Sequence, residues 1–368
     1  MNLIKLFLWY ISFSLTIFFS ADFIYSNFTW VEKPAAEWKY RIHHKYFDHT
    51  LANNFRGKGK WGNSEYQVCT NNLGLRDSCK KTQGSRTKFD IAFIGDSVTE
   101  GLGMTYENTF VGMFANNFKD INIANLSVSS YSPSVYLKKV EWFLDKGISF
   151  DHLIVFIDIS DIQDEAVNYR EASDGSLISN NAPVPKIIKI KRHIKDNFLL
   201  STKGVHALRS ILKQDSKTEN NISEIERIVW TDHWINARSA WTYNKDSLGY
   251  GDIGVQGGIN KAIDYMTRLH ELLQKKNIKL SIGVYPWPAQ INELLNIDTV
   301  NRQSKIWRDF CLSRCEMYVD TFPFFSKLVE SSGVEEVYNK FYIKGDVHFN
   351  KDGNHLIYSV LKENYESL

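Results

Sequence analysis

One stretch limits the possible folds of this chain more than any other: FDIAFIGDSVTEGLG at residues 89–103. An apolar run, Ile91 to Ile94, stops abruptly at a Gly-Asp-Ser turn, where the glycine allows the backbone to turn sharply. The pattern predicts a buried strand that ends in a tight turn and presents Ser97 beside the free amide donors of a helix start. Ser97 is therefore the candidate nucleophile. The alternative is an ordinary strand-to-helix loop in which Ser97 caps the helix.

Short apolar runs alternate with amphipathic stretches from this point onward. Strands that are apolar on both faces and joined through helices are typical of a parallel sheet covered on both sides. We therefore predict an α/β fold over residues 89–368, a three-layer α/β/α sandwich with a mainly parallel sheet of about five strands. The predicted strands are 91–94, 121–124, 153–158, 280–285 and 317–319, and the predicted helices are 107–117, 134–145, 256–276, 299–313 and 356–365.

Two segments depart from this alternation. Residues 30–88 are polar, contain Trp, Tyr and His, and show no helical period, so we predict short strands and loops that form an N-terminal extension packed on the main domain. Residues 164–255 are turn-rich and then basic at 186–196, and we predict a helical insertion that forms a lid beside the active site. For the basic patch, a membrane-surface role is the alternative to an ordinary solvated helix face.

The first 29 residues differ in composition from the rest. Lys5 precedes an apolar run from Leu6 to Phe19, which is typical of a secretory signal peptide or a signal anchor. Phe18 and Phe19 stand where a cleavage site would need a small residue, so we favour an uncleaved anchor in the membrane. We expect the bulk of the chain in the cell envelope, facing the periplasm or the exterior, or secreted if the segment is cleaved.

The four cysteines agree with export. Cys69 and Cys79 bracket a short loop, and Cys311 and Cys315 lie four positions apart, so we predict two local disulfides. Four buried thiols and a zinc site are the alternatives, although neither pair has the two-residue spacing of a zinc knuckle.

Charge and aromatic content narrow the function class. The 44 basic and 42 acidic residues are interspersed and give a net charge of +2, so no basic tract indicates nucleic-acid binding. Aromatic residues reach 14% of the chain. Such side chains line sugar-binding clefts in some proteins, and filling the core is the alternative.

A loop near the C-terminus carries the groups that a serine nucleophile needs. Within KGDVHFNKDGNH at 344–355, Asp346 and His348 stand two apart before the last predicted helix. Serine needs an imidazole to take its proton and a carboxylate to hold the tautomer of that imidazole. We predict that Asp346 faces one ring nitrogen of His348 and that Ser97 lies within hydrogen-bond reach of the other, or slightly beyond. Asp352 and His355 are weaker alternatives, because both fall at the start of the helix.

Taken together, Gly95-Asp96-Ser97 after the first core strand and Asp346 with His348 before the last helix resemble the SGNH/GDSL family of hydrolases. The resemblance covers roughly residues 88–366 without the insertion, and TNNLGLRD at 70–77 is similar to a segment that often precedes this domain in bacterial members. It implies a flavodoxin-like fold and an acyl-enzyme mechanism that needs no metal and no organic cofactor. The Asp-x-His spacing departs from the common Asp-x-x-His and resembles that of some relatives that acetylate exopolysaccharides.

The resemblance also implies an oxyanion hole. The amide of Ser97 would be one donor, and Ser130 stands where the family has a glycine whose amide is the second. Ser160 stands where an asparagine normally donates, so either Ser160 or a neighbour such as Gln163 compensates for the missing amide, or the enzyme is slow. Losing one oxyanion donor costs about 10²- to 10³-fold in rate.

Four further residues are candidates for the substrate pocket. Asp158 and Asp161 follow the third predicted strand, where they would bind substrate hydroxyls or cap the next turn. Trp287 follows the fourth strand, whose carboxyl end faces the ligand crevice in open α/β sheets. Trp241 precedes the helix after the insertion. Both rings would stack on sugars or fill the core.

These features together predict an exported serine esterase that acts on a small ester, an acetyl group on an envelope carbohydrate above all. An O-acyltransferase would use the same serine and histidine with a different acceptor. A non-catalytic carbohydrate-binding or assembly protein on the same scaffold is the alternative from another class. The sequence does not indicate an oligomeric state.

Overall fold

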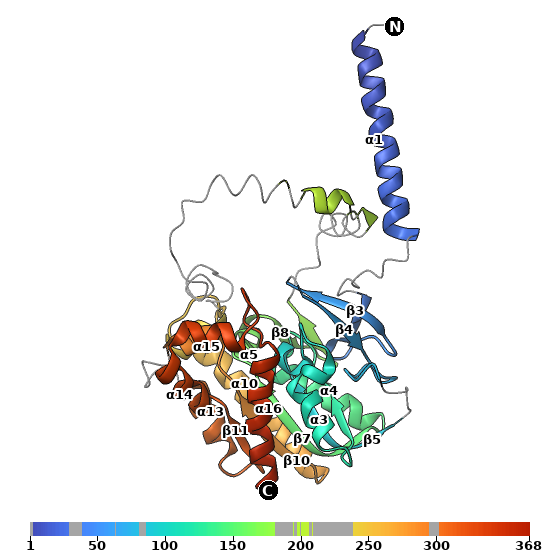
Figure 1. Cartoon of the computed structure of the whole chain (residues 1–368). Helices are drawn as coiled ribbons and strands as arrows, with labels where there is room; N and C mark the ends of the chain where they lie inside the picture. The colour runs from blue at the N-terminus through green and yellow to red at the C-terminus, as the bar shows by residue number, and fades with distance from the viewer. Residues whose placement is uncertain are drawn as a thin grey trace. The chain divides into compact units, whose positions relative to one another are not determined.

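The structure is a computed structural model that describes residues 3–28, 39–62, 64–80, 86–180, 238–293 and 302–368, with 194, 197, 198, 200–205 and 208 (Figure 1). The chain divides into two compact units, one made of residues 1–36 and 181–222 and the other of 37–180 and 223–368. The middle of the predicted lid insertion lies outside the described residues, so the lid stays a prediction.

The larger unit is built on a five-stranded sheet in the order β11-β10-β7-β5-β6, in which each neighbouring pair is parallel. Its strands are β5 (Lys88–Gly95), β6 (Ile123–Asn125), β7 (Ser149–Ile157), β10 (Lys279–Val284) and β11 (Tyr318–Asp320). Ile94, Val155 and Ile282 are completely buried, as expected for strands covered on both faces. All five overlap the predicted strands, and the α/β fold class is confirmed.

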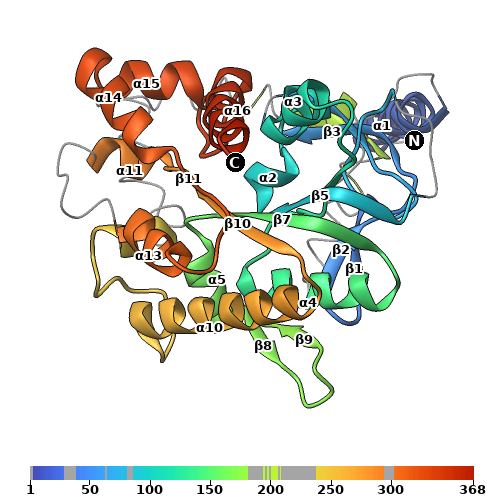
Figure 2. The same cartoon turned by 90° about the horizontal axis from the view of Figure 1, so that it is seen from below.

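Helices lie on both faces of this sheet, which makes three layers (Figure 2). Helices α4 (Pro133–Asp145) and α10 (Gly254–Lys275) lie on one face, and α3 (Phe110–Asn117) and α16 (Lys351–Glu366) on the other. These four and α13 (Arg302–Cys311) match predicted helices. Five further helices of the described residues were not predicted: α2 (Ser97–Glu100), α5 (Asp161–Val167), α11 (Pro288–Glu293), α14 (Phe322–Ser332) and α15 (Val334–Phe341).

The N-terminal extension consists of two antiparallel hairpins. Strands β1 (Arg41–His44) and β2 (Asp48–Leu51) form the first, and β3 (Arg56–Trp61) and β4 (Ser64–Cys69) the second. Short strands were predicted here. A third small hairpin, β8 (Tyr169–Glu171) with β9 (Leu177–Ser179), opens the predicted insertion, where a turn-rich segment without strands was expected.

The TNNLGLRD segment ties the extension to the loop that follows the candidate nucleophile. The side chain of Asn71 accepts hydrogen bonds from the amides of Leu73 and Leu75, which closes a tight turn. Arg76 is 1% exposed and donates to the carbonyls of Gln67, at 2.9 Å, and Met104, at 2.7 Å. One buried guanidinium therefore joins β4 to the residues after α2.

Both predicted disulfides, Cys69–Cys79 and Cys311–Cys315, are present. The cysteine pairs are therefore neither free thiols nor zinc ligands. The first disulfide closes the loop that follows β4, and the second closes the turn after α13.

The smaller unit contains α1 (Leu3–Phe28), a helix of 26 residues that is long and apolar enough to cross a membrane. A signal sequence near an N-terminus meets the same criteria. Its one acidic residue, Asp22, accepts hydrogen bonds from the amides of Leu200 and Ser201.

Candidate active site

The candidate nucleophile stands where β5 meets the short helix α2. A side chain at Gly95 would lie 2.6 Å from the carbonyl oxygen of Phe156 on the neighbouring strand, so only glycine fits this turn. Asp96 is the N-cap of α2, and its carboxylate accepts the amide hydrogen of Ser97 at 2.6 Å. Ser97 is thus the first residue of the helix. The alternative in which Ser97 caps the helix is wrong, because Asp96 holds that position.

The two ends of the domain meet at Ser97. Nε2 of His348 lies 2.8 Å from Oγ of Ser97, across 251 positions of sequence. Nδ1 of His348 is hydrogen-bonded to Oδ1 of Asp346, which also accepts the amide hydrogen of His348 at 3.0 Å. With Nδ1 carrying the proton, Nε2 is the acceptor for the serine hydroxyl. This is the geometry predicted for Ser97, His348 and Asp346.

The loop that carries the acid–base pair is held by its own backbone and by one tyrosine. The amide of Ile343 donates to the carbonyl of His348 at 2.8 Å. The hydroxyl of Tyr338, a residue of α15, accepts the amides of Gly345 at 2.8 Å and of Asp346 at 3.2 Å. The alternatives on α16, Asp352 and His355, are exposed, so they take no part in this arrangement.

Asp346 and His348 each stabilise the charged form of the other. Burial alone would lower the pKa of His348, but the hydrogen bond and the charge of Asp346 outweigh it and raise that pKa above its usual value. Burial would raise the pKa of Asp346, but hydrogen bonds from His348 and Trp61 lower it overall. The carboxylate is therefore ionised at neutral pH, and the imidazole is a stronger base than a free histidine.

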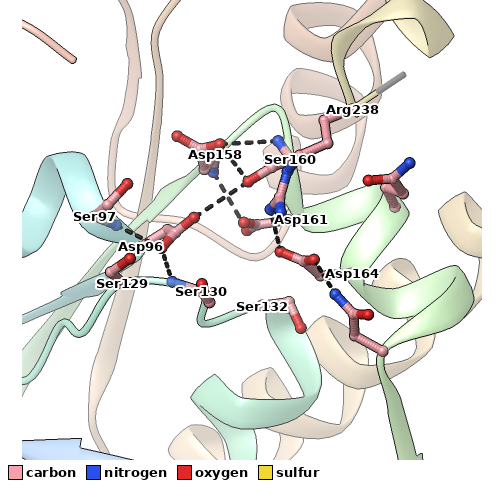
Figure 3. Close-up of polar contacts among 12 residues, drawn as sticks. Asp96, Ser97, Ser129, Ser130, Ser132, Asp158, Ser160, Asp161, Asp164 and Arg238 are labelled. Carbon is pink, nitrogen blue, oxygen red and sulfur yellow. Dashed lines mark hydrogen bonds and ion pairs between the residues drawn. The ribbon is translucent and has the colours of Figure 1, made fainter. Parts of the chain in front are cut away.

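The three predicted oxyanion donors converge on one carboxyl group, that of Asp96 (Figure 3). The amides of Ser97 and Ser130 both donate to Oδ1 of Asp96. The hydroxyl of Ser160 lies 3.2 Å from Oδ2 of Asp96 and 2.7 Å from Oδ1 of Asp158. Burial and the charges of nearby carboxylates raise the pKa of Asp96 to about 8, so it carries a proton at neutral pH.

Ser130 adopts the backbone conformation that the family's glycine would supply. Its φ is 66°, in the left-handed region that costs a residue with a side chain about 1–2 kcal/mol. A serine therefore fits this position, and contacts around the turn must offset the cost of its left-handed conformation.

The turn at Ser130 is held through its neighbour Ser129. Glu100 accepts the amide hydrogen of Ser129 at 2.7 Å and pairs with Arg41 at 3.0 Å. Arg41 also donates to the carbonyl of Ser129 at 3.1 Å, and Nε2 of His49 lies 2.8 Å from the same oxygen. The side chain of Glu100 is 3% exposed and that of Arg41 is 15% exposed, so the extension clamps this turn with a nearly buried ion pair.

Asp158 and Asp161 were predicted to bind substrate hydroxyls or to cap a turn, and the structure excludes the first role. Both are completely buried. Asp158 accepts hydrogen bonds from the amide of Ser160 at 2.8 Å, the hydroxyl of Tyr285 at 2.7 Å and the indole of Trp287 at 3.1 Å. Their carboxylates and that of Asp96 come within 4.8 Å of one another, and burial raises the pKa of Asp161 well above its usual range. The cluster is an internal hydrogen-bonded network.

Of the two roles predicted for Trp241 and Trp287, the structure supports filling the core. Trp241 is completely buried, with its indole donating to the carbonyl of Ile159 at 2.8 Å, and Trp287 is 3% exposed. Neither ring can stack on a sugar. The side chain of Gln163 donates to the carbonyl of Gly249 at 3.1 Å, and Gln163 bonds to Ser160 through its backbone amide, which donates to the Ser160 carbonyl at 3.0 Å. The predicted compensation by the Gln163 side chain is therefore not seen.

Several residues that support the site were not predicted from the sequence, although Asp96 lies within the Gly95-Asp96-Ser97 turn itself. They are Arg41, His49 and Trp61 of the extension, with Glu100 and Asp96 beside the nucleophile. Glu100 stands at a fixed offset from Ser97, at the end of the same four-residue helix, and this offset was a usable signal. The extension residues had none, because the partners that link them to the site lie 59 or more positions away.

Comparisons with known proteins gave structural similarities only. No family model and no curated protein matches the chain. The solved structures with a similar fold include a member of the lipolytic protein G-D-S-L family from Veillonella parvula, at 11% identity, with a TM-score of 0.41, covering 76% of this chain and 99% of that one. The acetyl xylan esterase AlAXEase is 15% identical, with a TM-score of 0.41, covering 75% and 98%. The esterase EstA from Pseudoalteromonas is 12% identical, with a TM-score of 0.38, covering 77% and 98%. What the site can do follows from its own geometry.

Proposed function

We propose that this protein is a serine esterase of the SGNH/GDSL type that acts through an acyl-enzyme. The observation that carries the proposal is the unbroken chain of hydrogen bonds from Asp346 through His348 to Oγ of Ser97. A nucleophile, a general base and a carboxylate that orients the base are the three parts that serine hydrolysis requires.

The residues divide the work as follows. Oγ of Ser97 attacks the ester carbonyl carbon while its proton passes to Nε2 of His348, and Asp346 stabilises the imidazolium. The tetrahedral intermediate collapses, the proton passes to the leaving alkoxide, and the acyl group stays on Ser97. Water then gives its proton to the same nitrogen, attacks the acyl group and releases the acid, and the proton returns to Ser97.

The oxyanion is held by the amides of Ser97 and Ser130. In the free protein these two amides donate to Oδ1 of Asp96, so the oxyanion must displace that oxygen as their acceptor. Because the raised pKa of Asp96 keeps its carboxyl neutral at pH 7, the exchange gives the amides a charged acceptor in place of an uncharged one. The exchange therefore favours the transition state over the ground state.

The substrate we propose is a small ester, in particular an acetyl group on a carbohydrate of the cell envelope. The similar structure named above is described as an acetyl xylan esterase. The envelope location is supported by the apolar helix α1 and by two disulfides, which persist in oxidising compartments.

An O-acyltransferase is the second candidate, and one observation favours it. Ser97 and His348 are each only 6% exposed. An acyl-enzyme shielded from water lasts longer, which gives a sugar hydroxyl time to accept the acyl group.

Labelling of the full-length chain in detergent with a fluorophosphonate probe tests the nucleophile. We expect a single adduct on Ser97 by mass spectrometry, none in Ser97→Ala, and labelling at least 10³-fold slower in His348→Ala. Ser359→Ala, a change on α16 away from the site, should label like the wild type. A folded wild-type sample that takes up no label at Ser97 would show that the assignment is wrong.

A second measurement separates the two candidates. Acetate release from an acetylated oligosaccharide is followed with and without an excess of unacetylated acceptor. An esterase releases the same acetate in both cases, whereas a transferase diverts it to the acceptor.

A further inference from the structure

Trp61, the last residue of β3, reaches the candidate active site from the N-terminal extension. Its indole N–H donates to Oδ2 of Asp346 at 2.8 Å, across 285 positions of sequence. Oδ1 of the same carboxylate accepts both hydrogen bonds from His348. Trp61 therefore supplies the donor on the side of Asp346 that faces away from the imidazole, and no other described donor is recorded there.

The ring of Trp61 also covers the acid–base pair. Its centroid lies 5.0 Å from that of His348 with an interplanar angle of 77°, an edge-to-face arrangement. A side-chain carbon at Gly103 would lie 3.5 Å from Cδ1 of Trp61, so the ring packs on the loop that follows α2 as well. The side chain of Asp346 remains 21% exposed, and water would compete for Oδ2 without this ring.

We propose that Trp61 is a positioning residue for the reaction, so that the hairpin β3–β4 is part of the active site and not only a cover on the domain. The indole fixes the rotation of the Asp346 carboxylate, which in turn fixes the tautomer and the plane of His348. It also helps to keep Asp346 ionised, because hydrogen bonds to a carboxylate favour its charged form. The inference rests on the proposed esterase function.

Covalent and hydrogen-bond contacts anchor the hairpin β3–β4 to the rest of the domain. The Cys69–Cys79 disulfide closes the loop after β4, and Arg56 at the start of β3 donates to the carbonyl of Cys79 at 2.6 Å. Arg76 then anchors β4 to the loop after α2. These contacts hold the open end of the hairpin, where β3 begins and β4 ends, and Trp61 lies at the other end, beside the turn.

Two substitutions separate the hydrogen bond from the ring. Trp61→Phe keeps an aromatic ring over His348 and removes only the N–H donor. Trp61→Gln places an amide nitrogen the same number of bonds from Cβ as the indole nitrogen, so it restores a donor without the ring. Trp142→Phe is the matched control, because Trp142 packs on His44 and Phe47 of the same extension.

We expect kcat/KM of Trp61→Phe for p-nitrophenyl acetate to fall by about 10- to 100-fold, since a hydrogen bond to a charged group contributes about 1.5–3 kcal/mol. Without the indole donor, the charge of Asp346 acts more strongly on His348, so the acid limb of the pH profile should move to higher pH. Trp61→Gln should recover part of the rate and return the limb towards the wild-type position. Trp142→Phe should match the wild type in kcat/KM and in the position of the acid limb.

The imidazole titration of His348, followed by NMR in wild type and Trp61→Phe, gives a readout that needs no turnover. A raised pKa in the variant supports the positioning role even if the wild type proves inactive, in which case only the proposed function fails. An unchanged His348 titration together with an unchanged pH profile in folded Trp61→Phe would overturn the inference. Equal losses in Trp61→Phe and Trp61→Gln, without a shift of the limb, would do the same by showing a packing role alone.

Discussion

Replacing Asp96 by Asn should remove the sensitivity of this protein to alkaline pH. The Asp96 carboxyl is protonated at neutral pH, since its pKa is raised to about 8, first by burial and then by the carboxylates of Asp158 and Asp164. In that form Oδ1 accepts the two amide hydrogens and the hydroxyl can donate to Ser160, which in turn donates to Asp158. Asparagine has the same shape, an acceptor oxygen and donor hydrogens, and cannot ionise.

The effect on stability follows from the two pKa values. An unfolded aspartate titrates near 3.8, so the folded chain binds this proton more tightly than the unfolded chain does. The free energy of unfolding should therefore be fullest below about pH 4, decrease as the pH rises through 8, and then level off. The difference corresponds to at most about 6 kcal/mol for this one group. In Asp96→Asn that slope disappears, so the variant gains on the wild type between pH 5 and pH 9.

Activity should follow the same ionisation. Above pH 8 the charged carboxylate of Asp96 competes with the developing oxyanion for the amides of Ser97 and Ser130, so kcat/KM of the wild type should fall. The variant should keep its rate to higher pH.

The assay compares kcat/KM for p-nitrophenyl acetate from pH 5 to 9.5 with urea unfolding at pH 5, 7 and 9, and uses Asp264→Asn, an exposed change on α10, as the control. The reasoning is refuted if Asp96→Asn keeps the alkaline fall in both measurements, or if wild-type stability increases from pH 5 to pH 9.

Three further outcomes are expected. Ser130→Gly should raise the free energy of unfolding by up to about 1 kcal/mol, because relief of the left-handed strain outweighs the greater freedom of glycine in the unfolded chain. Urea unfolding measures this, with Ser359→Gly inside α16 as the control, whose free energy of unfolding should fall by up to about 1 kcal/mol. A larger fall in Ser130→Gly than in this control would contradict the prediction. Arg41→Met should lower the free energy of unfolding by about 3–5 kcal/mol, because it leaves the buried carboxylate of Glu100 without its ion-pair partner. The double variant with Glu100→Gln should recover part of this loss. Additive losses in the double variant would show that Arg41 and Glu100 do not act as a pair. Esterase activity should fall with decreasing pH around a midpoint above 6.5, where His348 takes up a proton, and a midpoint below 6.5 would contradict the raised pKa.

The sheet was predictable because each of its strands is a short apolar run buried on both faces, a signal that lies within the strand itself. The hairpin β8–β9 was missed because its strands have only three residues each and neither alternates polar and apolar side chains. Helices α14 and α15 are separated by Gly333 alone, and neither gives a periodic pattern as long as that of α10.

The site was predictable only where chemistry selects the residue type. Ser97, Asp346 and His348 stand out because serine catalysis needs those three groups at strand and helix ends. Asp158 and Trp287 also stand at strand ends, and in the sequence they resemble pocket residues. In the structure both are buried, and the indole N–H of Trp287 donates a hydrogen bond to Asp158. Whether a strand-end residue faces solvent depends on the helices packed over it, and local spacing does not contain that information.

The residues of the candidate site lie far apart in the sequence. Ser97 meets His348 across 251 positions, and Trp61 meets Asp346 across 285. Contacts of such long range carry a large loop-closure cost and form slowly. A chain that is still being synthesised has no acid–base pair before His348 is made, so the proposed esterase activity can start only after these distant segments have come together.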